Sequence, residues 1–430
     1  MVSGTIELPV VTSPDGLSAE VVSVMRQMIA DAVIGRGLPQ GADPSSDSER
    51  VDLLTVLEQL KNTAAAAQAA LAVDLDRSVR DQHEAAGLPR GQRGRGVAAM
   101  IGLARSESPN RANTLLGLAR DLHSDLPHLA AALRSGRVSE FRATVVDRET
   151  GVLDSDDRRR VDTDLFGGDQ LAETLTWGTR QLAAETRKRV YALDPSAVAR
   201  AKERATSERR VSVRPAPSGM SYLTALLPLE RAVAAYACLY RDAQHDPAAM
   251  ADLLVERVTG QATADAVPVT VSLVVSDETL FNGGGDPGFV PGHGPVDAHT
   301  ARAWASEHGD YLRRFYADPQ GSLIAMTSVQ RFLRGALAAF LQIRDQGTCR
   351  TPWCDAPAVT GDHVTSAADG GETSGANGQG YCLACNLAKE APGWRQHVVP
   401  GQRHTVRTRT PTGHRYESSA PAPPTPHRRT

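Results

Sequence analysis

The chain has 430 residues, of which 41% are hydrophobic, 23% charged and 4% aromatic, and its formal net charge is −3. This composition is typical of globular proteins, and the length corresponds to two or three domains. A charge so close to zero excludes a globally basic nucleic-acid coat protein but permits a local basic surface. No stretch approaches the roughly 18 consecutive apolar residues of a membrane span, and no signal segment follows Met1. We therefore expect a cytoplasmic protein that does not associate with membranes.

Helical periodicity dominates the first two hundred residues. The predicted helices cover residues 17–34, 51–79, 98–104, 112–122, 129–133, 139–148, 155–165, 171–187 and 195–209. Pro109 and Pro127 mark boundaries between helices. Residues 90–96 combine three arginines with three glycines, which predicts a solvated loop.

The pattern changes after residue 209. Residues 210–214 alternate with period two, 215–219 are turn-rich and 220–226 are extended again, which predicts a β-hairpin. Helices are predicted over 229–241, 250–260 and 328–343, and a strand over 269–275. Residues 282–295 are rich in Gly and Pro but lack the Gly-Lys-Ser/Thr of a phosphate loop, so we expect a surface loop. The predicted fold class is α+β and mainly α-helical, with a large helical N-terminal region that contains a few strands.

Four of the five cysteines fall in a 37-residue window, namely Cys349, Cys354, Cys382 and Cys385. Two such pairs about thirty residues apart supply four thiolates, which suit tetrahedral zinc. Disulfides or free thiols are the alternatives, but clustered thiols in a chain without an export signal favour a metal site. The metal would supply much of the folding free energy of so small a segment. Cys238 lies outside the window, and we expect it to be a small core residue rather than a reactive thiol.

Polar residues between and after the cysteine pairs form a second candidate site. A four-cysteine zinc has no open coordination position, so the catalytic group must lie elsewhere. Asp362 offers a hard oxygen ligand, and His363 beside it is a candidate general base. Asn386 follows the last cysteine, and Lys389 lies one helical turn later. Oxygens of Asp362 and Asn386 suit Mg²⁺ or Mn²⁺. The plainer alternatives are an ordinary polar pair at Asp362 and His363 and a solvated Lys389.

These residues carry a specific resemblance. Asp362-His363, Asn377 and Asn386, framed by the cysteine pairs, resemble an HNH endonuclease motif of the zinc-bearing ββα-metal type, with Asn as its third letter. The wider chain resembles the actinobacterial proteins that join a DUF222 (13E12-repeat) domain to a C-terminal HNH module, through residues 126–127, 131–139, 292–296, 344–350, 370–373 and 389–394. The resemblance implies a mainly helical DUF222-like domain over 1–330, an HNH nuclease domain with a zinc-stapled ββα-metal module over 331–400, and a basic, Pro-rich tail over 401–430.

The resemblance also implies a role for each residue. His363 is the base that activates water for attack on a phosphodiester, while Asp362 and Asn386 hold the catalytic Mg²⁺ or Mn²⁺. Asn377 braces the loop that carries His363, although the residues alone leave it open as a simple turn residue. Lys389 contacts phosphate. The implied function is metal-dependent hydrolysis of DNA, expected to be double-stranded, by an endonuclease whose zinc is structural. Trp394 is expected to pack within the small module.

The end of the chain is locally basic, with seven arginines and a single acidic residue, Glu417, between residues 395 and 430. Alternation over 404–409 predicts a short strand that presents basic side chains, which would hold a phosphate backbone without reading its sequence. A solvated basic tail is equally compatible. Two other functions stay open. One is a non-catalytic zinc-ordered module that binds DNA or a protein, and the other is an N-terminal region that binds a protein partner and dominates the biology.

Overall fold

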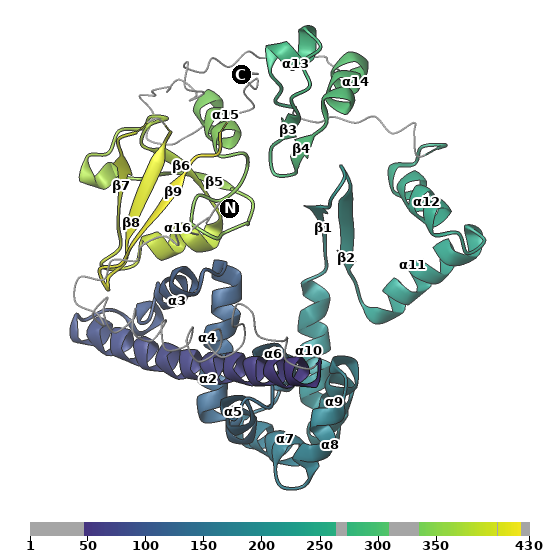
Figure 1. Ribbon diagram of the computed structural model, residues 1–430, viewed down its shortest axis with the longest axis vertical. Helices are drawn as coiled ribbons and strands as arrows, with labels where there is room; N and C mark the ends of the chain where they lie inside the picture. Colours follow the sequence, from purple (N-terminus) through teal and green to yellow (C-terminus); the bar gives the residue numbers. More distant parts are fainter. Residues whose placement is uncertain (1–46, 264–272, 309–334, 402, 423–430) are drawn as a thin grey trace.

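The computed structural model describes residues 47–263, 273–308, 335–401 and 403–422. The predicted helix 17–34, most of the predicted strand 269–275 and the start of helix 328–343 lie outside these residues. Figure 1 shows the helices of the first half gathered together, a small β-rich module beside them, and an arm that extends away. No helix in the described ranges combines the length and the apolar character that a bilayer crossing requires.

The N-terminal helices follow the sequence prediction closely. Ser108 caps one of them by accepting a hydrogen bond from the backbone of Arg111, with Pro109 at the first helical position. The predicted helix 171–187 was wrong in one respect, because Trp177 and Gly178 adopt extended backbone and split it in two. The helices are α2 (Asp47–Ala85), α3 (Val97–Arg105), α4 (Pro109–Ser124), α5 (Pro127–Arg134), α6 (Glu140–Thr150), α7 (Ser155–Phe166), α8 (Gln170–Thr176), α9 (Thr179–Leu193) and α10 (Pro195–Ser207). The 90–96 connection contains one 3₁₀ turn, η1 (Arg90–Gln92).

A continuous apolar core joins α4, α5, α6, α7 and α9. Leu129, Val146, Leu165 and Leu182 are completely buried there. The absence of a capping side chain at the start of α5 is compensated from another helix, since the buried carboxylate of Asp162 accepts hydrogen bonds from two backbone N–H groups of α5. Aliphatic burial therefore holds this half of the chain together.

One polar cluster interrupts that core. The guanidinium of Arg158 is buried and pairs with Asp121, Asp125 and Asp147. Burial, together with a hydrogen bond from Asp121, raises the pKa of Asp147 to about 7. Three carboxylates around one cation thus keep a proton at a pH where isolated aspartates are ionised.

A projecting arm follows α10. It consists of β1 (Arg210–Pro215), β2 (Ser221–Leu226), α11 (Leu229–Asp242) and α12 (Pro247–Thr259). The predicted hairpin is confirmed, since β1 and β2 pair antiparallel from Arg210↔Leu226 to Pro215↔Ser221. Every residue of both strands is exposed, and neither helix buries a residue. The prediction that Cys238 is a core residue was wrong, because its thiol lies half-exposed beside Arg241 of its own helix and Arg257 of α12.

A small unit lies between the arm and the module. It contains α13 (Asp277–Phe281), β3 (Gly288–Val290), β4 (Gly294–Val296) and α14 (Ala298–His308). The prediction of a simple surface loop over 282–295 was wrong, because left-handed Gly292 and Gly294 turn the chain so that β3 and β4 pair. Of the predicted strand 269–275, Val274 forms a bridge to Phe289.

The C-terminal module places two short strands before a helix. After α15 (Gly335–Arg344), β5 (Thr360–His363) pairs antiparallel with β6 (Gly378–Tyr381), and α16 (Leu383–Lys389) follows directly; a 3₁₀ turn, η3 (Ala367–Asp369), lies in the β5–β6 connection. A three-stranded sheet then forms from β7 (Arg395–Val399), β8 (Thr405–Arg409) and β9 (Arg415–Ser419). The predicted strand over 404–409 is confirmed as β8. The expectation of a tail from residue 401 was wrong, because its alternating residues pair with β7 and β9 and the fold continues beyond Ser419.

Buried charges lie beside the apolar cluster of Leu337, Phe340 and Leu341 in this module. The Arg344 guanidinium donates to the carboxylate of Asp345 and to two backbone carbonyls of the β5–β6 connection and β6. Asp345 also accepts from the backbone N–H of Gly380. Arg350 donates to the backbone carbonyls of His404 and Ser418, and burial lowers its pKa to about 10. Segment 344–350 thereby ties β6 to the β7–β9 sheet.

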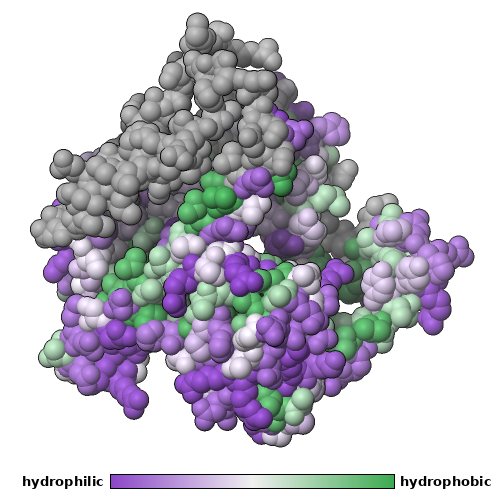
Figure 2. All heavy atoms as spheres, turned by 60° about the horizontal axis from the view of Figure 1, so that its bottom comes forward, coloured by the Kyte–Doolittle hydropathy of each residue, from purple (hydrophilic) through white to green (hydrophobic). Residues whose placement is uncertain are grey.

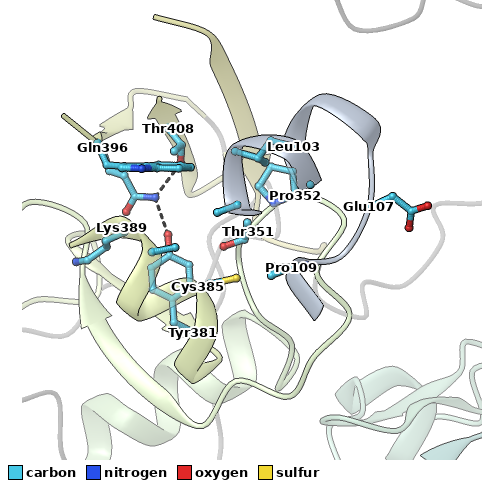
Figure 3. A pocket seen from close by; sticks show the side chains of 14 residues that line it. Leu103, Glu107, Pro109, Thr351, Pro352, Tyr381, Cys385, Lys389, Gln396 and Thr408 are labelled. Carbon is cyan, nitrogen blue, oxygen red and sulfur yellow. Dashed lines mark hydrogen bonds between the residues drawn. The ribbon is translucent and has the colours of Figure 1, made fainter. Parts of the chain in front are cut away.

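The module contacts the helical domain through Trp394. This side chain packs against the apolar cluster of α2, α3 and α4, so the expectation that it packs within the module was incomplete. Gly96, which precedes α3, allows the contact, since a Cβ atom there would lie 2.6 Å from the indole nitrogen. Figure 3 shows the small pocket at this boundary, where Gln396 donates hydrogen bonds to Tyr381 and Thr408.

Candidate metal centre and adjoining polar site

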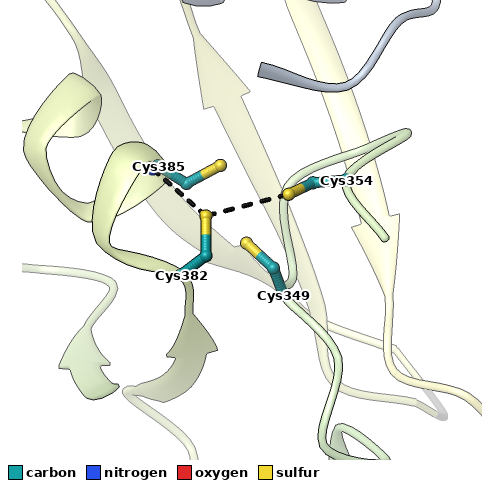
Figure 4. A group of neighbouring side chains, drawn as sticks. All are labelled: Cys349, Cys354, Cys382 and Cys385. Carbon is teal, nitrogen blue, oxygen red and sulfur yellow. Dashed lines mark hydrogen bonds between the residues drawn. The ribbon is translucent and has the colours of Figure 1, made fainter. Parts of the chain in front are cut away.

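The four clustered cysteines converge on one point. Cys349 and Cys354 come from the loop before β5, while Cys382 caps α16 and Cys385 lies in its first turn (Figure 4). Their sulfur atoms all lie within 4.8 Å of one another, and each residue is at most 8% exposed. The Sγ atoms of Cys354 and Cys382 are 3.8 Å apart, too far for a disulfide. The expected cluster is confirmed, and it could hold a metal ion.

The distance and the electrostatics both fit a tetrahedral ion. Metal–sulfur bonds of about 2.3 Å in a regular tetrahedron place the sulfurs about 3.8 Å apart. Hydrogen bonds from Cys354 and Cys385 lower the pKa of Cys349 to about 2, whereas their bonds to Cys349 raise the pKa of both partners. The sulfurs alone therefore favour one thiolate. A divalent cation would allow all four to ionise, because its charge offsets their repulsion.

Asp362 lies in β5, with Lys389 of α16 against it. The ammonium of Lys389 forms an ion pair with Oδ2 of Asp362 and donates a 2.6 Å hydrogen bond to the backbone carbonyl of His363. The Lys389 side chain is only 9% exposed, so it is not a solvated helix residue. Oδ2 of Asp362 is buried, and the Lys389 ammonium is its neighbour. A metal ion bound at this oxygen would share it with that ammonium.

His363 is the last residue of β5 and is half-buried. Its Nε2 lies 3.0 Å from the hydroxyl of Thr373, in the loop that joins β5 to β6. This contact fixes the orientation of the ring. The adjacent side chains of Asp362 and His363 thus have separate partners, one on α16 and one on the loop.

Asn377 closes that loop. Its amide oxygen accepts from the backbone N–H of Thr365, and its amide nitrogen donates to the carbonyls of Thr365 and Glu372. Gly371 lies within the closed loop, and a Cβ atom there would lie 1.9 Å from the Thr365 carbonyl oxygen. The loop after His363 therefore depends on both the amide and the glycine.

Asn386 occupies the second turn of α16 and is half-buried. Its side chain makes no hydrogen bond to any residue that the structure describes. With Lys389 three positions later, it lies on the same helix face. The contacts thus connect Lys389 to Asp362 and His363, and leave the amide of Asn386 open to a ligand.

Comparison with known families gives a match in the first part of the chain. The model described as Domain of unknown function (DUF222) matches residues 54–252. Residues 54–252 are similar to DUF222. No curated protein and no solved structure matches the chain. The match extends from α2 into α12, so it supports the DUF222 part of the resemblance, and the C-terminal module lies outside it.

Beyond the DUF222 match, the outer face of the β7–β9 sheet carries a row of arginines. Arg395 of β7 lies directly opposite Arg409 of β8, which lies directly opposite Arg415 of β9. All three are exposed, and none forms an ion pair with a described residue. The next row differs, because Arg407 pairs there with Glu417. Like charges directly opposite one another cost free energy, and a bound polyanion would remove that cost.

Sequence reasoning missed Asp345 and Arg350 as the residues that hold the site together. Asp345 is completely buried beside two arginines and orients β6, the partner strand of β5. The sequence does contain a signal, since charged residues flank the first cysteine on both sides where a small apolar core would be expected. Their burial depends on β6 and β9, which lie far along the chain, so local pattern does not reveal it.

Proposed function

We propose that the C-terminal module is a zinc-ordered, metal-dependent endonuclease that hydrolyses DNA phosphodiester bonds. The observation that carries this proposal is the buried carboxylate oxygen of Asp362, paired with Lys389 of α16, next to His363 at the end of β5. The resemblance of Asp362-His363, Asn377 and Asn386 to the HNH motif supports the same assignment. Zinc is proposed for the cysteine cluster, because tetrahedral coordination by four thiolates suits this ion, and four protein ligands leave no open position for a hydrolytic role.

In this proposal the side chains have separate tasks. His363, held by Thr373, accepts the proton of the attacking water. Asn377 keeps the loop of His363 closed and does not touch the substrate. Asp362 and Asn386 would hold Mg²⁺ or Mn²⁺, which supplies charge stabilisation for the phosphate and its departing oxygen when bound. The sulfur cluster fixes the start of α16 and thereby the position of Asn386.

Substitution of His363 tests the proposal. We expect His363→Ala to lose at least about 100-fold in Mg²⁺- or Mn²⁺-dependent nicking of a supercoiled plasmid, because general-base catalysis contributes about 10²–10⁴-fold. The matched control is His397→Ala, an exposed histidine of β7 in the same module. Metal content by mass spectrometry should show one zinc per chain in both variants. Undiminished nicking by His363→Ala would remove that residue from the mechanism.

Substitution of Lys389 tests the proposed Mg²⁺ or Mn²⁺ site at Asp362 and Asn386. Its ammonium shares Oδ2 of Asp362 with any cation bound there, so Lys389→Met should lower the Mn²⁺ concentration needed for half-maximal nicking. Titration of nicking against Mn²⁺ measures this shift. An unchanged Mn²⁺ requirement with weaker DNA binding would instead assign Lys389 to phosphate.

The arginine row favours a second candidate function, a non-catalytic module that binds the DNA backbone. Three arginines without an ion pair to any described residue, on strands about 4.8 Å apart, present positive charge without a means to read bases. A gel shift that persists in EDTA, with no cleavage in any divalent ion, would favour this function. The triple variant Arg395→Gln/Arg409→Gln/Arg415→Gln should weaken that shift far more than Arg407→Gln, because Glu417 already neutralises Arg407.

A further inference from the structure

The projecting arm, residues 210–259, leaves an unusual amount of apolar surface in water. Half of the large apolar side chains that are exposed among the described residues belong to it. They are Val211, Val213, Met220, Tyr222, Leu223, Leu226, Leu227, Leu229, Val233, Tyr236, Tyr240, Val255 and Val258. At about half exposure, and with on the order of 150 Å² per side chain, they present on the order of 1,000 Å². The largest apolar patch of a typical monomer is about 300–600 Å².

Helix α11 organises part of this surface into a seam. Leu229, Val233, Tyr236 and Tyr240 follow one another at spacings of four, three and four, which is the interval of a coiled-coil interface. Leu229 is 76% exposed and Tyr236 is 62% exposed, although this stripe is the apolar side of the helix. Alanines 232 and 237 flank the seam and would allow a second helix to approach closely. Figure 2 shows apolar surface on the lobe that projects from the molecule.

The hairpin before α11 has the same property. Both faces of β1 and β2 are exposed, and the two strands pair only with each other among the described residues. A two-stranded hairpin is marginally stable by itself in water, and its free edges present unpaired N–H and C=O groups. The hairpin and α11 therefore both expose apolar side chains that no described residue covers.

The charge of the arm indicates which partner fits. Residues 210–259 contain five arginines and five acidic residues, so the arm is neutral and unsuited to a polyanion. Two identical neutral arms do not repel each other. The seam is self-complementary, since two antiparallel copies of α11 would bring Leu229 opposite Tyr240 and Val233 opposite Tyr236. The exposed apolar area summed over the whole arm is comparable with the roughly 800 Å² per partner of a stable interface.

We propose that the arm is a dimerisation element, with a second copy of this chain as its occupant and the α11 seam at the two-fold axis. The interface is isologous, because each copy contributes the same patch. Association places the apolar stripe of α11 against its symmetry mate and removes it from water. The zinc module takes no part in this interface, so dimerisation is independent of the function proposed for that module.

Sedimentation analysis of the full chain over about 1–50 µM tests the proposal. We expect a species of twice the 45.8 kDa chain mass. The variant Val233→Glu/Tyr236→Glu should raise the dissociation constant at least about 100-fold, because both changes occur twice at a symmetric interface. The matched control is Leu71→Glu on α2, where the side chain is 68% exposed but lies outside the arm. That control should remain dimeric.

Hydrogen exchange of the wild-type chain keeps the test independent of the variants' folding. Amides of α11 should become more protected as the protein concentration rises. A wild-type monomer throughout the range would overturn the proposal, as would a dimer that persists unchanged in the Val233→Glu/Tyr236→Glu variant. Protection of α11 that does not depend on concentration would show that the chain covers its own seam, and would overturn the proposal as well.

Discussion

The interiors of the helical domain and of the C-terminal module are built from different kinds of side chain. In the helical domain, aliphatic side chains such as Leu129 and Leu182 are completely buried in a core that spans five helices. In the module, the central cluster consists of four cysteines and Tyr381, and completely buried positions include Asp345 and Gln379. Area burial stabilises the first region, whereas paired buried charges, and in our proposal a bound metal ion, add to the apolar contacts of the second. A smaller unit buries a smaller fraction of its surface on folding, so these additional interactions matter more there.

This contrast predicts that loss of the metal separates the two regions, and this is the largest effect we expect. With zinc in the cysteine cluster, as proposed, Cys385→Ser or a strong chelator should unfold residues 335–422 and leave the helical domain folded, because structural zinc contributes on the order of 10 kcal/mol to such modules. Hydrogen exchange resolved by segment measures it. Protection of α4–α7 should persist while protection of β5–β9 disappears. Retention of protection in both regions would show that the cysteines are dispensable.

Removal of the buried counter-charge is expected to have the next largest effect. Asp345→Ala leaves the guanidiniums of Arg344 and Arg350 buried without an anion, and should destabilise the module by about 3–5 kcal/mol. The matched control is Glu417→Ala, which removes an exposed partner of Arg407 and should cost less than about 1 kcal/mol. Denaturant unfolding, followed by zinc release, compares the two. Equal destabilisation by Asp345→Ala and Glu417→Ala would show that the buried carboxylate of Asp345 does not stabilise the module.

Lowering the pH should change the stabilities of the two regions in opposite directions. Burial lowers the pKa of His404 to about 4, below its unfolded value, so the module loses stability as pH falls from about 6.5 to 4. Burial raises the pKa of Asp147 to about 7, so the helical domain loses stability as pH rises from about 4 to 7. Each change should be on the order of 3 kcal/mol. Segment-resolved hydrogen exchange checks it, and His404→Gln and Asp147→Asn should each flatten the trend of its own region.

The smallest expected effect concerns the arginine row on the outer sheet. Arg409 has an arginine directly opposite it on each side, so Arg409→Thr should stabilise the module by a few tenths of a kcal/mol at low salt. The gain should disappear near 1 M salt, where charges are screened within about 3 Å. Thermal melting at two salt concentrations measures the difference. Destabilisation at low salt would indicate that the row takes part in folding.

Sequence pattern alone predicted the elements whose structure depends on residues close together in the chain. The uninterrupted run over 51–79 predicted α2, alternation predicted β1, β2 and β8, and the spacing of Cys349 to Cys385 predicted a clustered metal site. The resemblance to DUF222 is supported over 54–252. The identity of the metal, the endonuclease activity and the roles of His363 and Asn386 remain predictions.

The failures share a cause in long-range packing. The helix that contains Cys238 has the apolar periodicity of a buried helix, but periodicity does not tell which surface covers it. Trp177 and Gly178 interrupt a helical pattern through backbone geometry that flanking helix formers conceal. The function of Asp345 depends on β6 and that of Arg350 on β9, so neither was visible near the cysteines.

The contact of Trp394 with the glycine before α3 has a consequence for biosynthesis. The two residues are about 300 positions apart, and at about 5–20 residues per second the ribosome needs roughly 15–60 s to synthesise that interval. During this time the apolar cluster of α2, α3 and α4 is exposed on the nascent chain, because Trp394 has not yet been synthesised. Chaperones that recognise such surfaces therefore have a defined interval in which to act, and its length is set by translation speed.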